Sequence, residues 1–451
     1  MTPFAQRELA GWGRFPTQNC QVARPEKRRD LVQVATDTST PDLIARGAGR
    51  AYGDAALNRG SGVVLTEKLN RFLDFDARSH VLHAESGATL AEILRTFVPR
   101  GFGLAVAPGT KYVSLGGAIA GDVHGKNHRA EGCFSQFVKE FELLLASGEV
   151  LTCSRTQNAE AFWASVGGMG LTGIITTAKI RLWPIETAFI RTSYARQSDL
   201  DATLDAFERQ TSCYCVAWMD CLASGKDLGR SVLISGDHAI PEEIEGDPLA
   251  FEAPKTKKVP RDLPNFALNP FSVRAFNASY YASHADTTKI EGFEPFFWPL
   301  DAVSDWNRIY GARGFVQYQS VFPLETAREG LKTLLEALSS SGRAPFLAVL
   351  KQFGAQGQGL LSFPRPGYSL ALDLPASAGI EEFAQSLDAI TLKFGGRVYL
   401  AKDSTLSASS VRQMYPRLGE FLAIKTILDP QHRFQSSLSK RLRIGHSGET
   451  A

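Results

Sequence analysis

The sequence lacks several features that would assign it to a class at once. Its 49 basic and 47 acidic side chains nearly cancel, to a net charge of +2, whereas a nucleic-acid binder is expected to carry a clustered basic surface. No stretch approaches the roughly 18 uninterrupted apolar residues of a membrane-spanning helix, and MTPFAQRELAGWGRF lacks the apolar run of a secretory signal. We therefore expect no nucleic-acid partner and a location in the cytoplasm or at the periphery of the inner membrane, with the periplasmic side left open.

Cysteine is also scarce and irregularly spaced. The chain has six, of which Cys213, Cys215 and Cys221 cluster without the paired C-x-x-C spacing of a zinc site. His124 and His128 stand four residues apart, but Gly125 occupies the place of the glutamate in the H-E-x-x-H zinc motif. The sequence therefore predicts free thiols and no metal site.

What the chain does have is length and glycine. Its 451 residues are too many for one hydrophobic core, so two or three domains are expected. Residues 40–185 alternate β-like runs such as FELLLAS with helical patterns such as TLAEILRTFVPRG. Strand patterns return from residue 314 in GFVQYQSVFP, FLAVLKQFG and YSLALDLP. The pattern predicts an α+β protein.

Three glycine-rich stretches are the candidates for ligand binding. ARGAGRAYGD (45–54) frees consecutive backbone N–H groups for an anion such as a pyrophosphate, although a glycine turn without a ligand fits it equally well. PGTKYVSLGGAIAGDVHGKNH (108–128) contains residues small enough for a flat ring to pack on them. GGMGLTGII (167–175) matches G-x-G-x-x-G, but it follows a helical pattern and precedes a strand pattern, the reverse of a Rossmann NAD site.

Together and in this order, the three stretches resemble the FAD-binding domain of the vanillyl-alcohol-oxidase (PCMH-type) superfamily. In the C-terminal half, WNRIYGARGFVQYQ, LSFPRPGYSLALDLP, FGGRVYLAKDS and LDPQHRF resemble the decaprenylphosphoryl-ribose 2'-oxidases, the flavoprotein half of a two-enzyme epimerase. The similarity runs from about Gly11 to Leu442. It implies a two-domain α+β fold in which FAD lies between an FAD-binding domain and a substrate domain built on an antiparallel sheet.

The same resemblance sets the expected boundaries. Residues 1–189 would bind FAD, residues 190–396 would bind substrate, and residues 397–451 would return to the first domain. Mobile loops are expected around 250–300, because this stretch is rich in rings yet interrupted by Gly and Pro. Either these loops contact a membrane or they only cover the pocket. The candidate membrane contacts are basic and aromatic: Lys255, Lys257, Lys258, Arg261, Phe293, Phe296, Phe297 and Trp298.

The resemblance also implies a non-covalent FAD. Many superfamily members tether the flavin through a histidine just after the R-G-x-G turn, and this chain has Arg50 at that position. The implied FAD contacts come from the glycine stretches and one later tyrosine: Arg46, Gly47, Ala48, Gly49, Arg50, Ala51, Tyr52, Gly109, Thr110, Gly116, Gly117, Ala118, Ile119, Asp122, Gly125, Asn127, His128, Gly173, Ile174 and Tyr399.

Two residues are implied as catalytic. Lys402 would stabilise reduced-flavin charge and bind the developing alkoxide or the phosphate, and His124 would orient the substrate or accept its proton. Lys351 suits a phosphate, and Trp218 could equally be a core residue. The implied substrate contacts are Tyr52, Trp218, Phe297, Gln317, Gln319, Lys351, Ser369, Ala371 and Lys402.

The implied reaction is FAD-dependent oxidation of the ribose 2'-hydroxyl of a polyprenyl-phosphoryl-β-D-ribose to the 2'-keto intermediate, with the hydride passing from C2 to flavin N5. A separate NAD(P)H-dependent keto-reductase of the short-chain dehydrogenase type would complete the conversion to an arabinose donor for cell-envelope glycan. Two alternatives stay open at this point: a flavoprotein that acts on a free sugar or aldonolactone, and a lipid-carrier binding protein without catalysis.

Overall fold

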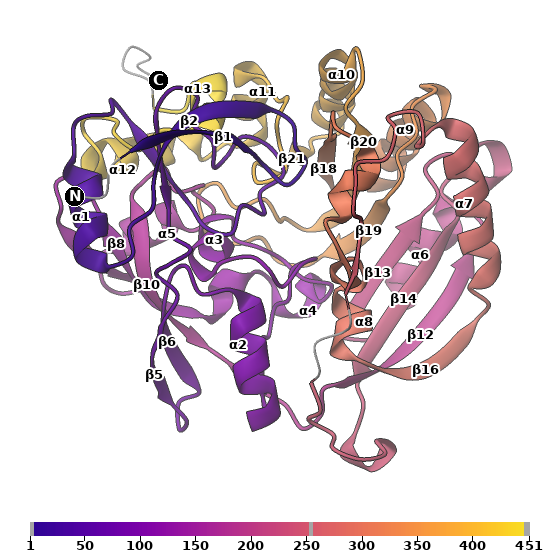
Figure 1. The fold of residues 1–451 in the computed structure, drawn as a ribbon. Coiled ribbons are helices and arrows are strands. Elements are labelled where there is room, and N and C mark those ends of the chain that lie inside the picture. Colours follow the sequence, from indigo (N-terminus) through magenta and orange to yellow (C-terminus); the bar gives the residue numbers. More distant parts are fainter. Residues whose placement is uncertain (1–3, 252–255, 446–451) are drawn as a thin grey trace.

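The computed structural model describes residues 4–251 and 256–445, and the strands of its first 184 residues form three sheets with helices around them (Figure 1). The smallest pairs β7 (Phe102–Gly103) with β11 (Trp183–Pro184). The four-stranded sheet has the order β1-β2-β4-β3 and consists of β1 (Ala5–Ala10), β2 (Thr17–Ala23), β3 (Leu43–Arg46) and β4 (Gly62–Leu65). The five-stranded sheet has the order β5-β6-β10-β8-β9 and consists of β5 (Phe72–Asp76), β6 (Val81–Glu85), β8 (Val138–Leu144), β9 (Val150–Ser154) and β10 (Ile174–Arg181).

The helices of this part are α1 (Arg28–Thr36), α2 (Leu90–Phe97), α3 (Leu115–Ala120), α4 (His128–Glu131) and α5 (Ala159–Ser165). Two of them, α2 and α5, lie within the helical patterns of the sequence, at TLAEILRTFVPRG and NAEAFWASVGG. A capping box starts α2, because the Thr89 hydroxyl accepts from Glu92 N at 3.2 Å while the Glu92 carboxylate accepts from Thr89 N. The third glycine stretch lies between α5 and β10, which confirms that it is not a Rossmann turn.

The second half of the chain is built on an eight-stranded antiparallel sheet of order β16-β12-β14-β13-β19-β20-β18-β21. Its strands are β12 (Phe189–Gln197), β13 (Tyr214–Met219), β14 (Ser231–His238), β16 (Thr287–Gly292), β18 (Phe315–Pro323), β19 (Ala348–Phe353), β20 (Gly367–Pro375) and β21 (Arg397–Val398). One face packs under the apolar sides of α6 (Leu200–Arg209), α9 (Ala327–Ser340) and α10 (Ile380–Lys393). The other face turns toward the N-terminal half of the chain.

The prediction of loops around 250–300 is wrong for residues 270–297. Helix α7 (Pro270–Ser283) begins at Asn269, whose side chain accepts from the backbone N–H groups of Phe271 and Ser272, and Pro270 occupies its first turn. β16 and a short helix, α8 (Phe293–Phe297), follow. A helix therefore forms here despite the Gly and Pro residues of this stretch, because Asn269 caps its N-terminus and proline is tolerated at the first helical position.

The aromatic residues expected at a membrane are also placed differently. Phe293, Phe296, Phe297 and Trp298 are at most 7% exposed and form a cluster with Tyr214 of β13. They pack α8 onto the sheet, so the prediction that they contact an acyl chain at the surface is wrong. Among the basic candidates Lys257, Lys258 and Arg261 are exposed, and Lys255 lies outside the described residues.

The C-terminal segment returns to the N-terminal sheet. It contains α11 (Ala408–Met414), α12 (Leu418–Leu428) and α13 (Ser437–Leu442), which are drawn in yellow next to β1 and β2 in Figure 1. Leu43 of β3 pairs with Phe434, and the Arg433 guanidinium donates to the carbonyl oxygens of Thr40 and Asp37. The boundaries at residues 189 and 396 stay predictions.

Two further sequence predictions concern thiols and membrane spans. All six cysteines are free, as predicted. Within residues 4–251 and 256–445, no helix is both long enough and apolar enough to cross a membrane.

A buried ion pair fixes the end of α12, and its removal should destabilise the fold. Lys425 Nζ donates to Asp429 Oδ2 at 2.7 Å, and both side chains are 0% exposed. Asp429→Ala leaves a buried ammonium without its counter-charge, so we expect a loss of about 3 to 5 kcal/mol in the free energy of unfolding. The exposed pair Arg417–Glu420 provides the control, since Glu420→Ala should cost less than about 1 kcal/mol. Equal shifts of the two variants in urea unfolding would contradict this.

Candidate active site

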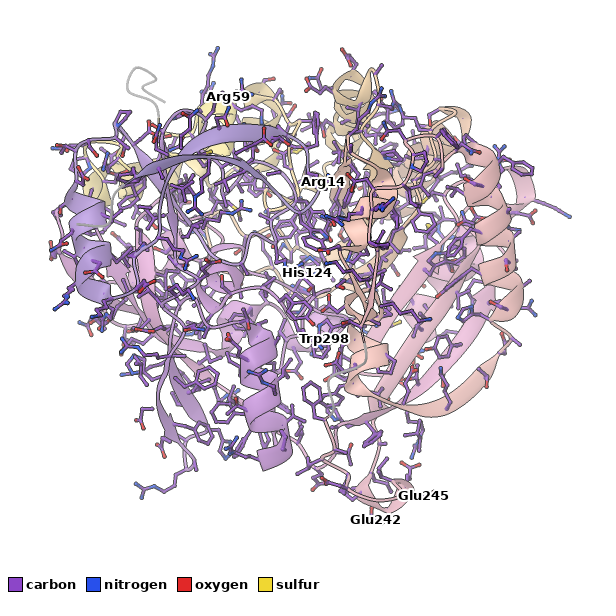
Figure 2. All side chains as sticks on the ribbon, viewed as in Figure 1. Arg14, Arg59, His124, Glu242, Glu245 and Trp298 are labelled. Carbon is purple, nitrogen blue, oxygen red and sulfur yellow. The ribbon has the colours of Figure 1, made fainter. Side chains whose placement is uncertain are left out.

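A cavity of about 550 Å³ lies where the two halves of the chain meet. The glycine stretches line one side of it, and β13, β14, β18, β19 and β20 of the eight-stranded sheet line the other. His124 lies at this junction in the middle of the molecule (Figure 2). The cavity therefore brings together the two groups of residues that the sequence marks as cofactor-binding and substrate-binding.

Most of the predicted FAD residues line this cavity. Gly109 presents its Cα atom to open space, since a Cβ there would meet nothing within 4 Å, whereas a Cβ at Gly117 would approach Ser114 Oγ to 3.0 Å. Gly109 thus leaves room for a ligand at the wall. The predicted FAD residues on the wall are Gly47, Ala48, Gly49, Arg50, Ala51, Tyr52, Gly109, Thr110, Gly116, Gly117, Gly173 and Tyr399.

The other predicted FAD residues lie behind the wall and support it. The Arg46 guanidinium donates to Ala10 O at 2.7 Å. The buried Asp122 carboxylate accepts from Ser135 N at 3.2 Å and from the Ser362 hydroxyl. The eight residues that do not line the cavity, and whose contact with FAD stays a prediction, are Arg46, Ala118, Ile119, Asp122, Gly125, Asn127, His128 and Ile174.

All nine predicted substrate residues line the cavity, including Trp218, Phe297 and Ala371. Gln319 lies between two other polar groups of the wall, because its Nε2 lies 3.1 Å from His124 Nε2 and donates to Ser369 Oγ at 3.1 Å. The antiparallel register of β18, β20 and β19 produces this grouping, since it pairs Gln319 with Ala371 and Lys351 with Ser369.

His124 is held as a neutral imidazole. Burial is the main reason that its pKa lies well below the usual value, and the nearby charge of Lys351 lowers it further. Its ring packs edge-on against Phe353, with a centroid separation of 4.6 Å. A neutral ring on the wall can accept a hydrogen bond or a proton from a sugar hydroxyl.

Lys402 lies over the ring of Tyr52, with Nζ 3.7 Å from the ring centroid. Burial lowers the pKa of Lys402, and the charge of Asp373 opposes this shift. Asp373 is fully buried and accepts hydrogen bonds from Gln317 Nε2 at 2.5 Å and from Tyr310 OH at 3.0 Å. Asp373 does not appear among the sequence candidates, although it follows Ala371 at the same i, i+2 spacing that groups the other polar wall residues.

Two more lysines give the cavity positive charge. Burial lowers the pKa of Lys351 to about 8 and that of Lys126 to about 7, and the Lys126 ammonium donates to Phe296 O. Lys126 was also missed, although it stands inside the second glycine stretch, two residues after His124. None of the described residues that line the cavity is acidic, so the positive charge of these lysines suits an anionic ligand.

The wall also carries polar atoms with no partner. Arg50 Nε, Ser86 Oγ, His124 Nδ1 and Gln317 Oε1 are buried without a hydrogen bond, and all four residues line the cavity. Unsatisfied buried polar atoms cost about 1 to 3 kcal/mol each, so a polar ligand in this cavity would stabilise them. The cavity's size, its glycine walls and these open donors and acceptors fit a cofactor such as FAD.

Comparison with known proteins identifies the class first. The FAD-binding domain family matches residues 17–154, which carry the first two glycine stretches, and the D-arabinono-1,4-lactone oxidase family matches residues 371–442. The chain is therefore a flavoprotein oxidoreductase that uses FAD, with the two-domain α+β fold expected of the vanillyl-alcohol-oxidase type.

Relatives over the full length narrow this class. The chain is 37% identical to decaprenylphosphoryl-β-D-ribose oxidase of Mycolicibacterium smegmatis, with 98% of each chain covered. It is 22% identical to L-gulono-1,4-lactone dehydrogenase of Mycobacterium tuberculosis, over 96% of this chain and 98% of that one. It is 23% identical to mouse L-gulonolactone oxidase, over 96% of each. The chain belongs to the decaprenylphosphoryl-β-D-ribose oxidase family.

Filling the glycine wall should reduce FAD binding. Gly109→Val adds a side chain where the wall is open toward the cavity. Since overpacking a fitted site costs about 1 to 3 kcal/mol, the purified variant should bind FAD at least about tenfold more weakly, as measured by titration of flavin fluorescence. Gly419→Val is the matched control, because it lies on α12 with nothing within 4 Å of an added Cβ. Unchanged affinity in Gly109→Val would contradict the assignment of this wall.

Proposed function

We propose that this protein oxidises the 2'-hydroxyl of a polyprenyl-phosphoryl-β-D-ribose to the 2'-keto sugar, with FAD held without a covalent bond. The observation that carries the substrate assignment is the charge of the cavity, where Lys126, Lys351 and Lys402 line a wall whose described residues include no acid. These three ammonium groups are half-buried, and positive charges held partly away from water favour an anionic ligand. A phosphate joined to the sugar supplies it, whereas a neutral lactone does not.

The chain's own residues would position the sugar and take up its proton. When bound, FAD supplies the acceptor for the hydride that leaves ribose C2. The hydroxyl proton leaves to the protein, where neutral His124 and the deprotonated form of Lys402 are the available bases. In its charged form, Lys402 stabilises negative charge that develops near the sugar or the flavin, and Gln319 holds His124 in place.

Non-covalent attachment is supported by the setting of Arg50. Its guanidinium lies over the ring of Trp12, with Cζ 4.1 Å from the centroid, and its second aromatic neighbour is Tyr112 at 5.2 Å. A guanidinium held by cation–π contacts offers no nucleophile for a bond to flavin.

We extend the proposal to the partners. The third glycine stretch lies in the wrong context for NAD(P)H, so reduction of the keto sugar falls to a separate short-chain-type reductase, toward an arabinose donor for the cell envelope. Peripheral membrane contact is supported by the exposed Lys257, Lys258 and Arg261, each worth about 1 kcal/mol near anionic headgroups.

One observation favours a second candidate function. The match of residues 371–442 to D-arabinono-1,4-lactone oxidase includes Asp373 and Lys402 and would suit oxidation of an aldonolactone or a free sugar by the same FAD. A neutral lactone or free sugar carries no negative charge that would interact with Lys126 and Lys351.

The test of function is an anaerobic titration of the purified holoprotein. Polyprenyl-phosphoryl ribose should bleach the flavin absorbance, whereas free pentoses and aldonolactones should not. Lys402→Met should still bind the substrate but bleach at least about 100-fold more slowly, because it removes a group that acts during the reaction. Bleaching by a lactone alone would reject the proposal in favour of the second candidate.

The pH dependence should follow the buried lysines. A phosphodiester keeps one negative charge from pH 6 to 9, while Lys126 and Lys351 lose their positive charges as pH rises through about 7 and 8. We therefore expect kcat/KM to fall as pH rises from about 7 to above 8, because substrate binding weakens as each lysine loses its charge.

Substitution of one lysine gives the matched comparison. Lys351→Met should raise KM about tenfold at pH 7, the value of a hydrogen bond to a charged group, and should flatten the fall of kcat/KM at high pH. The exposed Lys332→Met on α9 should behave as the unmodified protein. A Lys351→Met variant with unchanged KM would show that the phosphate binds elsewhere.

A further inference from the structure

The cavity has an apolar end that the proposed chemistry does not use. Next to Lys351, whose strand β19 pairs with β13, the wall of this end consists of the side chains Val216, Trp218, Ile234, Phe346, Leu347 and Val349, with two aromatic residues of α7 beside them. These two residues are Phe276 and Tyr280. We call this part, lined by the eight residues just named, the apolar arm. Oxidation of a sugar hydroxyl requires no such surface, so the arm calls for a ligand group of its own.

Contacts between aromatic rings line the arm from the interior of the protein to its surface. Tyr280 packs on Trp218 with ring centroids 4.5 Å apart, and Phe276 packs on Phe346 at 4.9 Å. Trp218 is only 6% exposed, whereas Phe276 is 43% exposed. The arm therefore runs outward along α7 and opens at Phe276.

The position of α7 is fixed by polar contacts on its other sides. Asn277 Nδ2 donates to Asp220 Oδ1 at 2.7 Å, and both residues are buried. Tyr281 OH donates to Gln197 O at 3.3 Å. Because these contacts hold the helix to the edge of the sheet, its Phe276 and Tyr280 side chains form a fixed wall of the cavity.

The surface around the mouth is unusually apolar. Phe271, at the start of α7, is 83% exposed, and Phe266 and Leu263, just before the helix, are 78% and 41% exposed. The basic residues Lys257, Lys258 and Arg261 lie a few positions earlier in the chain. Exposed rings next to basic side chains are typical of a surface that meets an apolar ligand with anionic surroundings.

We infer that the apolar arm binds the first isoprene units of the substrate's polyprenyl chain, and that the rest of the chain leaves the protein between Phe276 and the exposed Phe271. The inference rests on the proposed lipid-linked substrate. The phosphate then lies at the lysines, the ribose extends toward Lys402 and His124, and the chain runs the opposite way along α7. Branched aliphatic and aromatic walls suit the methyl-branched isoprene chain, because each apolar group of the chain that moves from water into the arm lowers the free energy of the complex.

The arm predicts a dependence on chain length that ends where the arm ends. For ribose phosphoryl-linked to one, two, three or more isoprene units, kcat/KM of the holoprotein should rise at least about tenfold over the first units and then level off. In the double variant Phe276→Ala/Tyr280→Ala this rise should shrink to less than about threefold. A rise of the same size in the double variant would overturn the inference.

Arg274→Ala is the control, because Arg274 is exposed on α7 and does not line the cavity. It should keep the full rise with chain length. Should no polyprenyl-phosphoryl ribose reduce the flavin of the unmodified protein, the proposed function fails, and the location of the lipid is then decided by the labelling experiment alone.

Photo-labelling of the unmodified holoprotein tests the inference without any variant. The probe is a polyprenyl phosphate that carries a diazirine on its second isoprene unit and no sugar. After irradiation, mass spectrometry should place the label on the peptides that contain Phe276 and Tyr280 or residues 346–349. Label confined to the exposed residues 257–271, or spread over the molecule, would overturn the inference.

Discussion

The burial of positive charge is the constraint on which this site depends. Removing an ammonium group from water costs several kcal/mol, and the lowered pKa values of Lys351 and Lys126, about 8 and about 7, express that cost. A fold tolerates such charges when a bound ligand offsets the free-energy cost of their desolvation. Under the proposed function, the substrate's phosphate would do so at the junction of the two halves, where the second glycine stretch supplies Lys126 and the eight-stranded sheet supplies Lys351.

The strand register turns this constraint into a site. Gln319 pairs with Ala371 and Lys351 pairs with Ser369, so one face of β18, β20 and β19 carries the polar wall while the other packs under α9 and α10. A shift of one residue would exchange the two faces, placing the lysine in the core and apolar side chains in the cavity. The tight packing of the helix-covered face, with Leu350 and Leu370 fully buried, therefore secures the chemistry on the opposite face.

Sequence patterns predicted which side chains share one face of a strand, but they did not predict contacts between residues that are distant in the sequence. Alternation identified Gln317, Gln319 and Lys351, because period-2 spacing alone assigns side chains to one face of a strand. It could not tell whether the rings around Phe296 face solvent or the sheet, since both arrangements give the same composition, and the structure buries them. Asp373 was missed for a related reason: its role depends on Tyr310 and Lys402, which lie far from it in the sequence.

The position of Asp373 separates two kinds of lysine in one cavity. Its carboxylate lies behind the wall, where Gln317 and Tyr310 orient it, and its charge favours the protonated form of Lys402. The pKa of Lys351 is lowered by burial alone, so this lysine keeps its need for an external anion. A carboxylate on the wall itself would neutralise both lysines and repel a phosphate. Because the charge of Asp373 acts on Lys402 and its side chain does not line the cavity, Asp373 would support the lysine that serves the proposed redox step, and Lys351 would bind the substrate's phosphate.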